Sequence, residues 1–281
     1  MRGHSQSFDP RQVMHAETFE VFHYREPRPA GVEVHHHDFY EVYYLLSGQV
    51  EYWVEGRILQ MHPGDLLLIN PMELHRPMVN PETPVYERIV LWIHKAYLEG
   101  LSAEATLSRC FAPELPNLIT PSATDKPMLT ALMQDLVKEY YSKEFESDLC
   151  ARGLFLQLMV RLNRLALHAR EGQQEKQQST LVQQALHWIA EHIGEELTLE
   201  ELAKVCFVSK YHLSHAFTRE VGVSIHRYIM LRRLLMARQL LSAGEAAGQV
   251  CISCGFSDYT SFYRAFKAEY GLSPKAFSES R

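Results

Sequence analysis

The chain has 281 residues, 46% hydrophobic and 22% charged, a composition typical of a globular protein with room for two domains. No run of about 18 apolar residues occurs, and MRGHSQSFDP at the start lacks the apolar stretch of a secretory signal, so we expect no membrane segment. Five scattered cysteines argue against a disulfide framework and favour the reducing cytoplasm. Residues 180–281 carry 11 Lys and Arg against 10 Asp and Glu, a net charge of +1. Since the total is −6, residues 1–179 carry −7. The weak basic bias of residues 180–281 permits phosphate contacts there but would not by itself suggest nucleic-acid binding.

The first part of the chain, from about residue 18 to residue 95, has the pattern of short strands. Segments rich in Val, Ile, Tyr and Trp are separated by glycines and prolines at the short spacing of an antiparallel barrel or sandwich. The clearest of these segments are VEVHHHDFYEVYYLLSG, VEYWVEG, RILQMHPGDLLLINP and YERIVLWI.

From about residue 127 to residue 170 the apolar spacing changes to three and four, which predicts two amphipathic helices. The second of them contains LFLQLMVRLNRLAL, which could pack on the β domain or form a dimer seam. EGQQEKQQS, residues 171–179, has no apolar residue and is typical of a linker. Every later segment has a helical pattern. We therefore predict an α+β protein of two domains: residues 1–170, with strands followed by a helical pair, and an all-α domain at 180–281.

The all-α part contains one supersecondary unit twice. Leu202 and Val250 match at an offset of 48, and Phe217 and Phe266 match at an offset of 49. Each copy has a short helix, a turn of three or four residues and a second helix that ends at a glycine, which is the pattern of a helix-turn-helix. Plain helical hairpins share this spacing, so the exposed face has to distinguish the two.

Once the apolar positions are assigned to the core, the second helix of each copy has a face of hydroxyls, aromatic rings and cations with almost no carboxylate. Such a face matches the donors and acceptors of the DNA major groove and the phosphates beside it. If both helices enter one face of double-stranded DNA, they should lie about 34 Å apart. The predicted DNA-contacting residues are Lys210, Tyr211, Ser214, His215 and Arg219 in the first copy, and Tyr259, Thr260, Tyr263, Arg264 and Lys267 in the second.

These residues lie in a stretch that resembles a known family. LTLEELAKVCFVSKYHLSHAFTREVGVSIHRYIMLRRLLMARQLL, followed by GFSDYTSFYRAFKAEYGLSPKAF, is similar to the C-terminal DNA-binding domain of AraC/XylS-type transcription regulators. The resemblance covers about 100 residues and places base-contacting positions on both second helices. It also implies a cupin-like N-terminal sensor, a homodimer, and RNA polymerase as a further partner if the protein is an activator.

The helix before the second turn departs from the family pattern. Its residues are Ala247, Gly248, Gln249, Val250 and Cys251, where the family has an Ile, a small polar cap and then Ile-Ala. Gly248 and Gly244 should weaken this helix by about 1 kcal/mol each relative to Ala. We therefore expect the first unit to contribute the firmer share of DNA binding.

The run HHHDFYE is the other unusual feature. His35, His37, Glu41 and Gly48 fit the first motif of the cupins, and His75 follows as a possible fourth ligand. In a strand, His35, His37 and Glu41 would share one face, and such a set could hold a divalent first-row metal. The spacing before His75 is one residue short of the second cupin motif, however.

The sensor domains of AraC-type regulators are themselves cupin-like, and there the resemblance implies a small-molecule pocket more often than a metal. We therefore expect no bound metal and no cofactor, with His35, His37, Glu41 and His75 as the ligands if a metal does bind. Imidazole and carboxylate give directed hydrogen bonds, and aromatic faces stack on sugar rings, so the expected effector is a sugar or related metabolite. The predicted ligand-binding residues are His35, His37, Glu41, Tyr43, Trp53, His75 and Trp92.

Two functions follow. The first is a ligand-responsive transcription regulator that controls carbohydrate-use genes, in which the effector changes how the sensor contacts the dimer helices or the DNA-binding domain. The alternative is a metal-dependent cupin enzyme with a helical appendage. The alternative leaves the duplicated helix-turn-helix without a role, so we favour the regulator over an enzyme.

Overall fold

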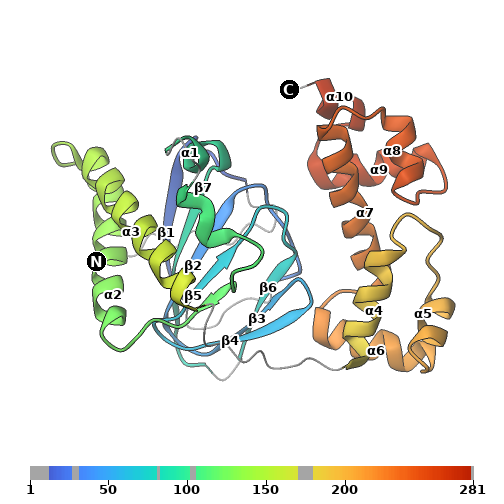
Figure 1. Ribbon diagram of the computed structural model, residues 1–281, viewed down its shortest axis with the longest axis horizontal. Helices are drawn as coiled ribbons and strands as arrows, with labels where there is room; N and C mark the ends of the chain where they lie inside the picture. Colours follow the sequence, from blue (N-terminus) through green and yellow to red (C-terminus); the bar gives the residue numbers. More distant parts are fainter. Residues whose placement is uncertain (1–12, 27–31, 81–82, 102–105, 170–179, 280–281) are drawn as a thin grey trace. The chain divides into compact units, whose positions relative to one another are not determined.

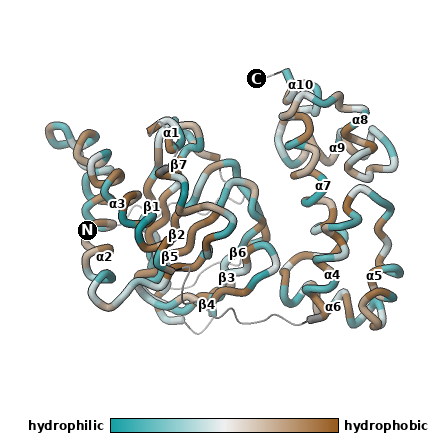
Figure 2. Tube along the Cα trace, viewed as in Figure 1, coloured by the Kyte–Doolittle hydropathy of each residue, from teal (hydrophilic) through white to brown (hydrophobic). Residues whose placement is uncertain are grey.

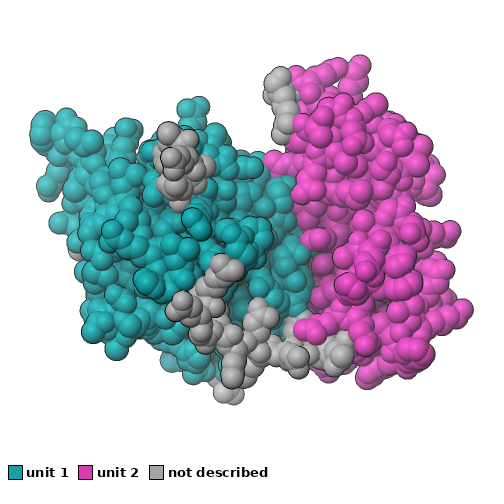
Figure 3. Space-filling view, in the orientation of Figure 1, with its two compact units in different colours: residues 1–176 teal, residues 177–281 magenta. Residues whose placement is uncertain are grey.

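The computed structural model describes residues 13–26, 32–80, 83–101, 106–169 and 180–279. The chain divides into two compact units, residues 1–176 and residues 177–281 (Figure 3). The division falls within the linker predicted at 171–179, which lies outside the described residues. Among the described residues, no helix is long and apolar enough to span a membrane.

Among the residues that the structure describes, unit 1 has eight strands in two antiparallel sheets, which Figure 1 draws as arrows. The α+β class predicted from the sequence is therefore confirmed, but the sheets do not close into a barrel. Strand β5 is followed in its sheet only by the two-residue strand β8, and the histidines of the HHHDFYE run form one isolated bridge, His35 to His75, rather than a continuous strand. The five-stranded sheet has the order β1 (Phe19–Glu26), β7 (Tyr86–Ile93), β2 (Tyr40–Ser47), β5 (Leu66–Ile69), β8 (Leu118–Ile119), and the three-stranded sheet β4 (Arg57–Met61), β3 (Val50–Val54), β6 (His75–Val79).

Strand β2 shows how the sequence divides between two cores. Its alternate residues Val42 and Tyr44 pack in a cluster with the helices, whereas Tyr43 and Leu45 pack in a second cluster with the three-stranded sheet. Residues on both faces of β2 are buried, and β2 and β5 are largely brown in Figure 2. A strand with both faces buried has a nearly continuous apolar run instead of an alternating one, which explains YEVYYLL.

Two long helices cover the outer face of the five-stranded sheet (Figure 1). Phe19 of β1 stacks on Phe155 of α3 with 4.6 Å between ring centroids, and Lys126 of α2 reaches the buried carboxylate of Asp65 at 3.2 Å. These contacts fix the helical pair on the sheet. The helical elements of unit 1 are α1 (Lys95–Gly100), the 3₁₀ helix η1 (Thr106–Phe111), α2 (Asp125–Tyr140) and α3 (Ser147–Ala169).

The regular elements that the structure describes in unit 2 are all helices, and they include both predicted helix-turn-helix units. Helix α5 (Leu199–Val205) begins with a capping box in which Thr198 and Glu201 satisfy each other's backbone amides, whereas the N-cap of α8 (Ala247–Ser253) is Ala246, whose side chain makes no capping hydrogen bond. The two units are connected by the long helix α7, which is capped by Ser224. The bounds are α4 (Thr180–Glu191), α5 (Leu199–Val205), α6 (Lys210–Val221), α7 (Ile225–Ser242), α8 (Ala247–Ser253), α9 (Tyr259–Tyr270) and α10 (Pro274–Glu279).

Arg233 on α7 ties the loop after α4 to the second helix-turn-helix. Its side chain donates hydrogen bonds to the carbonyl oxygens of Ile193 and Glu195 at 3.1 and 2.6 Å. Gly255, in the turn between α8 and α9, lies against the same loop, and a Cβ atom there would be 2.9 Å from the Arg233 guanidinium and from the Ile193 oxygen. The loop and the second turn therefore form one packed contact.

Candidate functional site

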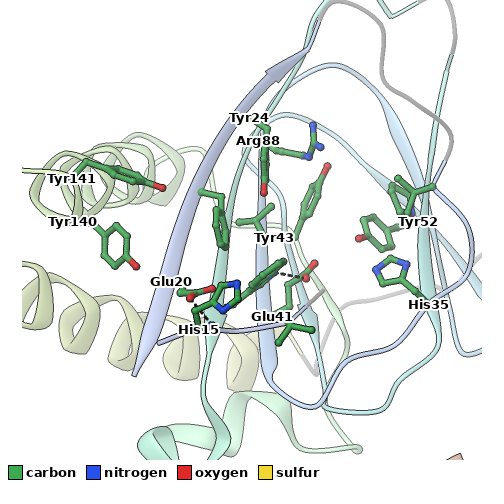
Figure 4. Close-up of a pocket in the computed structure, with 16 residues that line it drawn as sticks. His15, Glu20, Tyr24, His35, Glu41, Tyr43, Tyr52, Arg88, Tyr140 and Tyr141 are labelled. Carbon is green, nitrogen blue, oxygen red and sulfur yellow. Dashed lines mark hydrogen bonds between the residues drawn. The ribbon is translucent and has the colours of Figure 1, made fainter. Parts of the chain in front are cut away.

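A cavity of about 510 Å³ lies in unit 1 (Figure 4). Its walls come mainly from β1, β2, β3 and β7, with further residues from the segment before β1 and from the end of α2. A volume of this size and a largely aromatic lining are typical of a site for one small molecule. The lining residues are Val13, His15, Glu20, Phe22, Tyr24, Val32, His35, Glu41, Tyr43, Tyr52, Pro77, Arg88, Val90, Trp92, Tyr140 and Tyr141.

Four of the seven predicted ligand-binding residues line this cavity, namely His35, Glu41, Tyr43 and Trp92. The side chains of His37 and His75 are buried directly behind them and do not line it. Trp53 is also fully buried but lies away from the cavity, because side chains alternate along β3 and it is the neighbouring Tyr52 that lines the wall. Of these two neighbours, Tyr52 and not the predicted Trp53 lines the cavity.

The three histidines are held by the backbone in one orientation each. His35 Nδ1 donates to the Glu33 carbonyl at 2.9 Å, His37 Nδ1 to the Phe39 carbonyl at 2.9 Å, and His75 Nδ1 to the Glu73 carbonyl at 2.8 Å. A carbonyl oxygen can only accept, so the proton is on Nδ1 in all three rings, and in a neutral ring Nε2 is an acceptor. The ring centroids of His35 and His37 lie 4.3 and 4.8 Å from that of His75.

Burial keeps two of these rings neutral. It lowers the pKa of His35 to about 4, although the hydrogen bond to the Glu33 carbonyl acts in the opposite direction. The pKa of His75 is also lowered well below its ordinary value, first by burial and then by His35 and His37. His75 Nε2 has no hydrogen-bond partner among the described residues. This nitrogen is therefore a buried hydrogen-bond acceptor that no described residue satisfies.

Glu41 adds a carboxylate to the cluster. Trp92 Nε1 donates to Glu41 Oε2 at 3.0 Å, and His37 Nε2 lies 3.3 Å from the same oxygen. Two facing acceptors at that distance need a proton or a cation between them. The cluster of His37, Glu41 and His75 thus offers acceptor atoms to a donor or a positive charge.

The same three residues satisfy the requirements of a divalent metal site. Their potential ligand atoms lie within 4.8 Å of one another, all three side chains are buried, and the two histidines are oriented by backbone carbonyls as metal ligands usually are. Imidazole and carboxylate donors suit first-row ions such as Zn²⁺. The same acceptors would equally take the hydroxyl groups of a ligand.

The other end of the cavity is rich in hydrogen-bond donors (Figure 4). The guanidinium of Arg88 lies between the rings of Tyr24 and Tyr86, 4.7 and 4.3 Å from their centroids, and pairs with Glu26 at 3.2 Å. The hydroxyls of Tyr43 and Tyr86 are hydrogen-bonded to each other. Burial raises the pKa of Tyr24 to about 12, so its hydroxyl keeps its proton at neutral pH.

Several lining residues are absent from the sequence-based set. Arg88 could have been found, since it has the same strand parity as Trp92 and is a lone cation in the apolar segment YERIVLWI. Glu20, whose Oε1 accepts from the backbone amides of His15 and Ala16 at 2.8 Å, gave no such signal. Tyr140 and Tyr141 come from the end of α2, and only the fold brings them to the cavity wall.

The ten predicted DNA-contacting residues lie on α6 and α9. All are exposed except Ser214, which is half-buried, whereas Leu213, Phe217, Phe262 and Phe266 on the opposite faces are completely buried. Ser209 caps α6 and Asp258 caps α9 through their side chains. The two helices therefore present their polar and aromatic residues to solvent, while the buried apolar residues on the opposite faces hold them in unit 2.

The cations on these faces are not equally free. Lys210 pairs with Glu200 and lowers the pKa of that carboxyl, and Arg219 pairs with Glu220 at 3.3 Å. Arg264 and Lys267 have no ion-pair partner among residues 180–279. Helix α9 thus has its charges available for phosphates, and α6 has to exchange an existing pair to use Lys210.

Comparison with known families matches residues 19–159 to the AraC-like ligand-binding domain and residues 202–280 to a helix-turn-helix domain. The chain belongs to the AraC family of transcription regulators. The resemblance inferred from the sequence is thereby confirmed, and the family's members are DNA-binding regulators rather than enzymes. The metal-dependent enzyme considered as an alternative is not supported.

Relatives of known sequence agree over most of the chain. The HTH-type transcriptional activator RhaS of Escherichia coli O139:H28 is 24% identical over 270 residues, 91% of each chain, and the regulator YbfI of Bacillus subtilis is 27% identical over 225 residues, 80% of this chain and 78% of that one. A longer regulator from Staphylococcus aureus (strain COL) is 24% identical, and the match spans 31% of its length. Among solved structures, the C-terminal domain of AraT from Geobacillus stearothermophilus is 29% identical and covers 38% of this chain and 89% of that chain, with a TM-score of 0.36.

Proposed function

We propose that this AraC-family regulator senses a polyhydroxylated metabolite, such as a sugar, in the cavity of unit 1 and controls carbohydrate-use genes in the cytoplasm. The observation that carries the proposal is the division of the cavity into an acceptor end, with Glu41 and His35, and a donor end, with Arg88 and the tyrosines. Each sugar hydroxyl is both a donor and an acceptor, so a polyol can satisfy both ends. The ring faces of Tyr52 and Trp92 suit the C–H faces of a pyranose.

The effector class can be tested by thermal unfolding of the full chain against a panel of monosaccharides and disaccharides, with amino acids and fatty acids as comparison classes. A sugar that binds should raise the unfolding temperature in a concentration-dependent way. The shift should be lost in Glu41→Gln and kept in Glu51→Gln, a matched change at an exposed strand position. A shift given only by another class, or one that Glu41→Gln leaves unchanged, would reject the sugar or the cavity respectively.

We propose further that α6 and α9 enter the major groove of double-stranded DNA, with the ten exposed residues named above as contacts. Their exposure and the buried phenylalanines behind them support this placement. His215→Ala should relax base preference at one position of the site and Arg264→Ala at another, by a factor of about 5 to 150 each. The readout is enrichment from a random-sequence duplex library, and an unchanged preference in both variants would reject the assignment.

The proposed regulator acts as a homodimer through α3. One face of this helix packs in unit 1, and the other leaves four large apolar residues exposed at intervals of seven, four and seven residues, the spacing of a coiled-coil seam. Their exposed fractions are 64% for Leu149, 40% for Leu156, 39% for Val160 and 43% for Leu167. Similarity to an activator, RhaS, supports activation of transcription and hence RNA polymerase as a partner.

A further inference from the structure

The turns of the two helix-turn-helix units have the same backbone structure but different residues at one position. In the first turn, Phe207 N donates to Lys204 O and Val208 N to Ala203 O; in the second, 48 residues later, Gly255 N donates to Ile252 O and Phe256 N to Cys251 O. Phe207 and Gly255 occupy the same position in these turns. Both have left-handed backbones, with φ of 56° for Phe207 and 74° for Gly255.

The left-handed conformation favours glycine, because the Cβ of any other residue approaches the following carbonyl oxygen. Gly255 meets that requirement and is also enclosed by the loop at Ile193 and by Arg233. Phe207 has a Cβ atom and is therefore strained in this conformation, and its exposed ring makes no packing contact with the described residues to offset the strain. The side chain is 94% exposed, the highest exposure among the large hydrophobic residues of unit 2 that the structure describes.

The position of Phe207 relative to α6 indicates what the ring contacts. It lies two residues before Ser209, the N-cap of α6, and the equally unusual Tyr211, 82% exposed, follows in the first turn of that helix. In helix-turn-helix proteins the residues at the start of the second helix are those that contact base edges. An apolar ring beside them matches one feature of the major groove in particular, the C5-methyl group of thymine.

We propose that Phe207 is a specificity-determining residue that contacts the methyl group of a thymine at the edge of the site bound by α6. A contact with DNA, which members of the family bind, would explain why a strained and exposed position carries an apolar ring. The inference rests on the proposed placement of α6 in the major groove. Since Gly255 has no side chain, only the first unit makes such a contact, and the two halves of the DNA site are contacted in chemically different ways.

The experiment uses the full chain and a duplex selected by it from a random-sequence library. Each thymine of the selected site is replaced singly by deoxyuridine, which removes only the methyl group, and affinity is measured by fluorescence anisotropy at fixed salt. Loss of one buried methyl group should weaken wild-type binding about three- to fivefold at the contacted position. Phe207→Gly should bind the parent site correspondingly less tightly and show no further loss at that position.

Two controls separate the possible outcomes. Phe207→Gly should unfold at the same or a higher temperature than the wild type, since glycine relieves the backbone, and Phe207→Tyr should keep the sensitivity to deoxyuridine. If His215→Ala changes base preference while Phe207→Gly gives the wild-type deoxyuridine profile, the Phe207 contact is wrong and the placement of α6 stands. If neither variant changes the profile, the placement of α6 is itself wrong. A Phe207→Gly variant with unchanged affinity and a lost response in cells would instead assign the ring to a protein partner and overturn the proposal.

Discussion

Lowering the pH from 7 to 5 should destabilise unit 1 through its buried histidines. The unfolded chain protonates His35 near its ordinary pKa of 6.5, whereas burial lowers the pKa of this ring to about 4 in the folded protein. Between those pH values the unfolded state binds more protons than the folded state. The contribution of neutral His35 to the free energy of unfolding is therefore fully present above pH 6.5 and is lost progressively as the pH falls toward 4. At pH 5, which is 1.5 units below 6.5, the loss from His35 alone is about 2 kcal/mol. His75, whose pKa is lowered for the same reason, adds to it in the same direction.

The assay is urea unfolding followed by tryptophan fluorescence at pH 7 and pH 5. Trp188 belongs to α4 in unit 2, so a Trp188→Phe background leaves Trp53 and Trp92 to report on unit 1 alone. Many groups titrate over this range, so the decisive quantity is the difference between variants. His35→Asn keeps a side-chain donor but cannot be protonated, and it should lose about 2 kcal/mol less than its background between the two pH values. A His168→Asn control changes an exposed histidine of the same unit. Equal pH dependence in all three proteins would refute the reasoning.

The remaining predictions concern the second turn, the α8 cap, the dimer seam and the histidine cluster. Gly255→Ala should destabilise unit 2 by at least 1 to 2 kcal/mol in thermal unfolding, because the new Cβ meets atoms at 2.9 Å in a left-handed backbone; an unchanged unfolding temperature would contradict the packed contact. Ala246→Ser should supply the missing cap of α8 and stabilise unit 2 by about 1 kcal/mol, and a loss of stability would show that the cap geometry is misjudged. Leu156→Glu should convert the dimer to monomer in analytical ultracentrifugation, whereas an unchanged mass would exclude α3 as the seam. Dialysis against a chelator should leave the effector-induced thermal shift intact; a shift abolished by the chelator, restored by Zn²⁺ and absent in His75→Gln would make the cluster a metal site.

Local pattern was sufficient to predict the helical half of the protein. The spacing of Leu213 and Phe217, with Ser209 before them and Gly222 after, defines α6 without reference to any other segment. The same is true of α9, where Asp258 and Gly271 mark the ends. Each of these helices is specified by its own residues, so its exposed face could be derived before the fold was known.

The cavity could be predicted only in part, since its walls come from distant segments. His35, Glu41 and Tyr43 could be predicted because they lie close together in the sequence. The strand expected over the histidines is nevertheless interrupted by a bend at Asp38, and His35 pairs with His75 through an isolated bridge. Trp53 was misplaced because strand parity depends on which neighbour faces inward, and this depends on pairing with other strands. The lack of barrel closure likewise depends on pairing between distant strands, which no local pattern records.

Helix α4 and the loop after it connect the two helix-turn-helix units more closely than the order of the sequence suggests. It packs against α5 and α6 of the first unit, and the loop at its end is clamped by Arg233 against the turn of the second. The helix that directly follows the linker region packs on the unit nearest to it in the sequence, and the loop at its end contacts the unit farthest from it. A displacement of α4 relative to α7 would therefore disturb contacts with both units, although α4 carries none of the proposed base contacts.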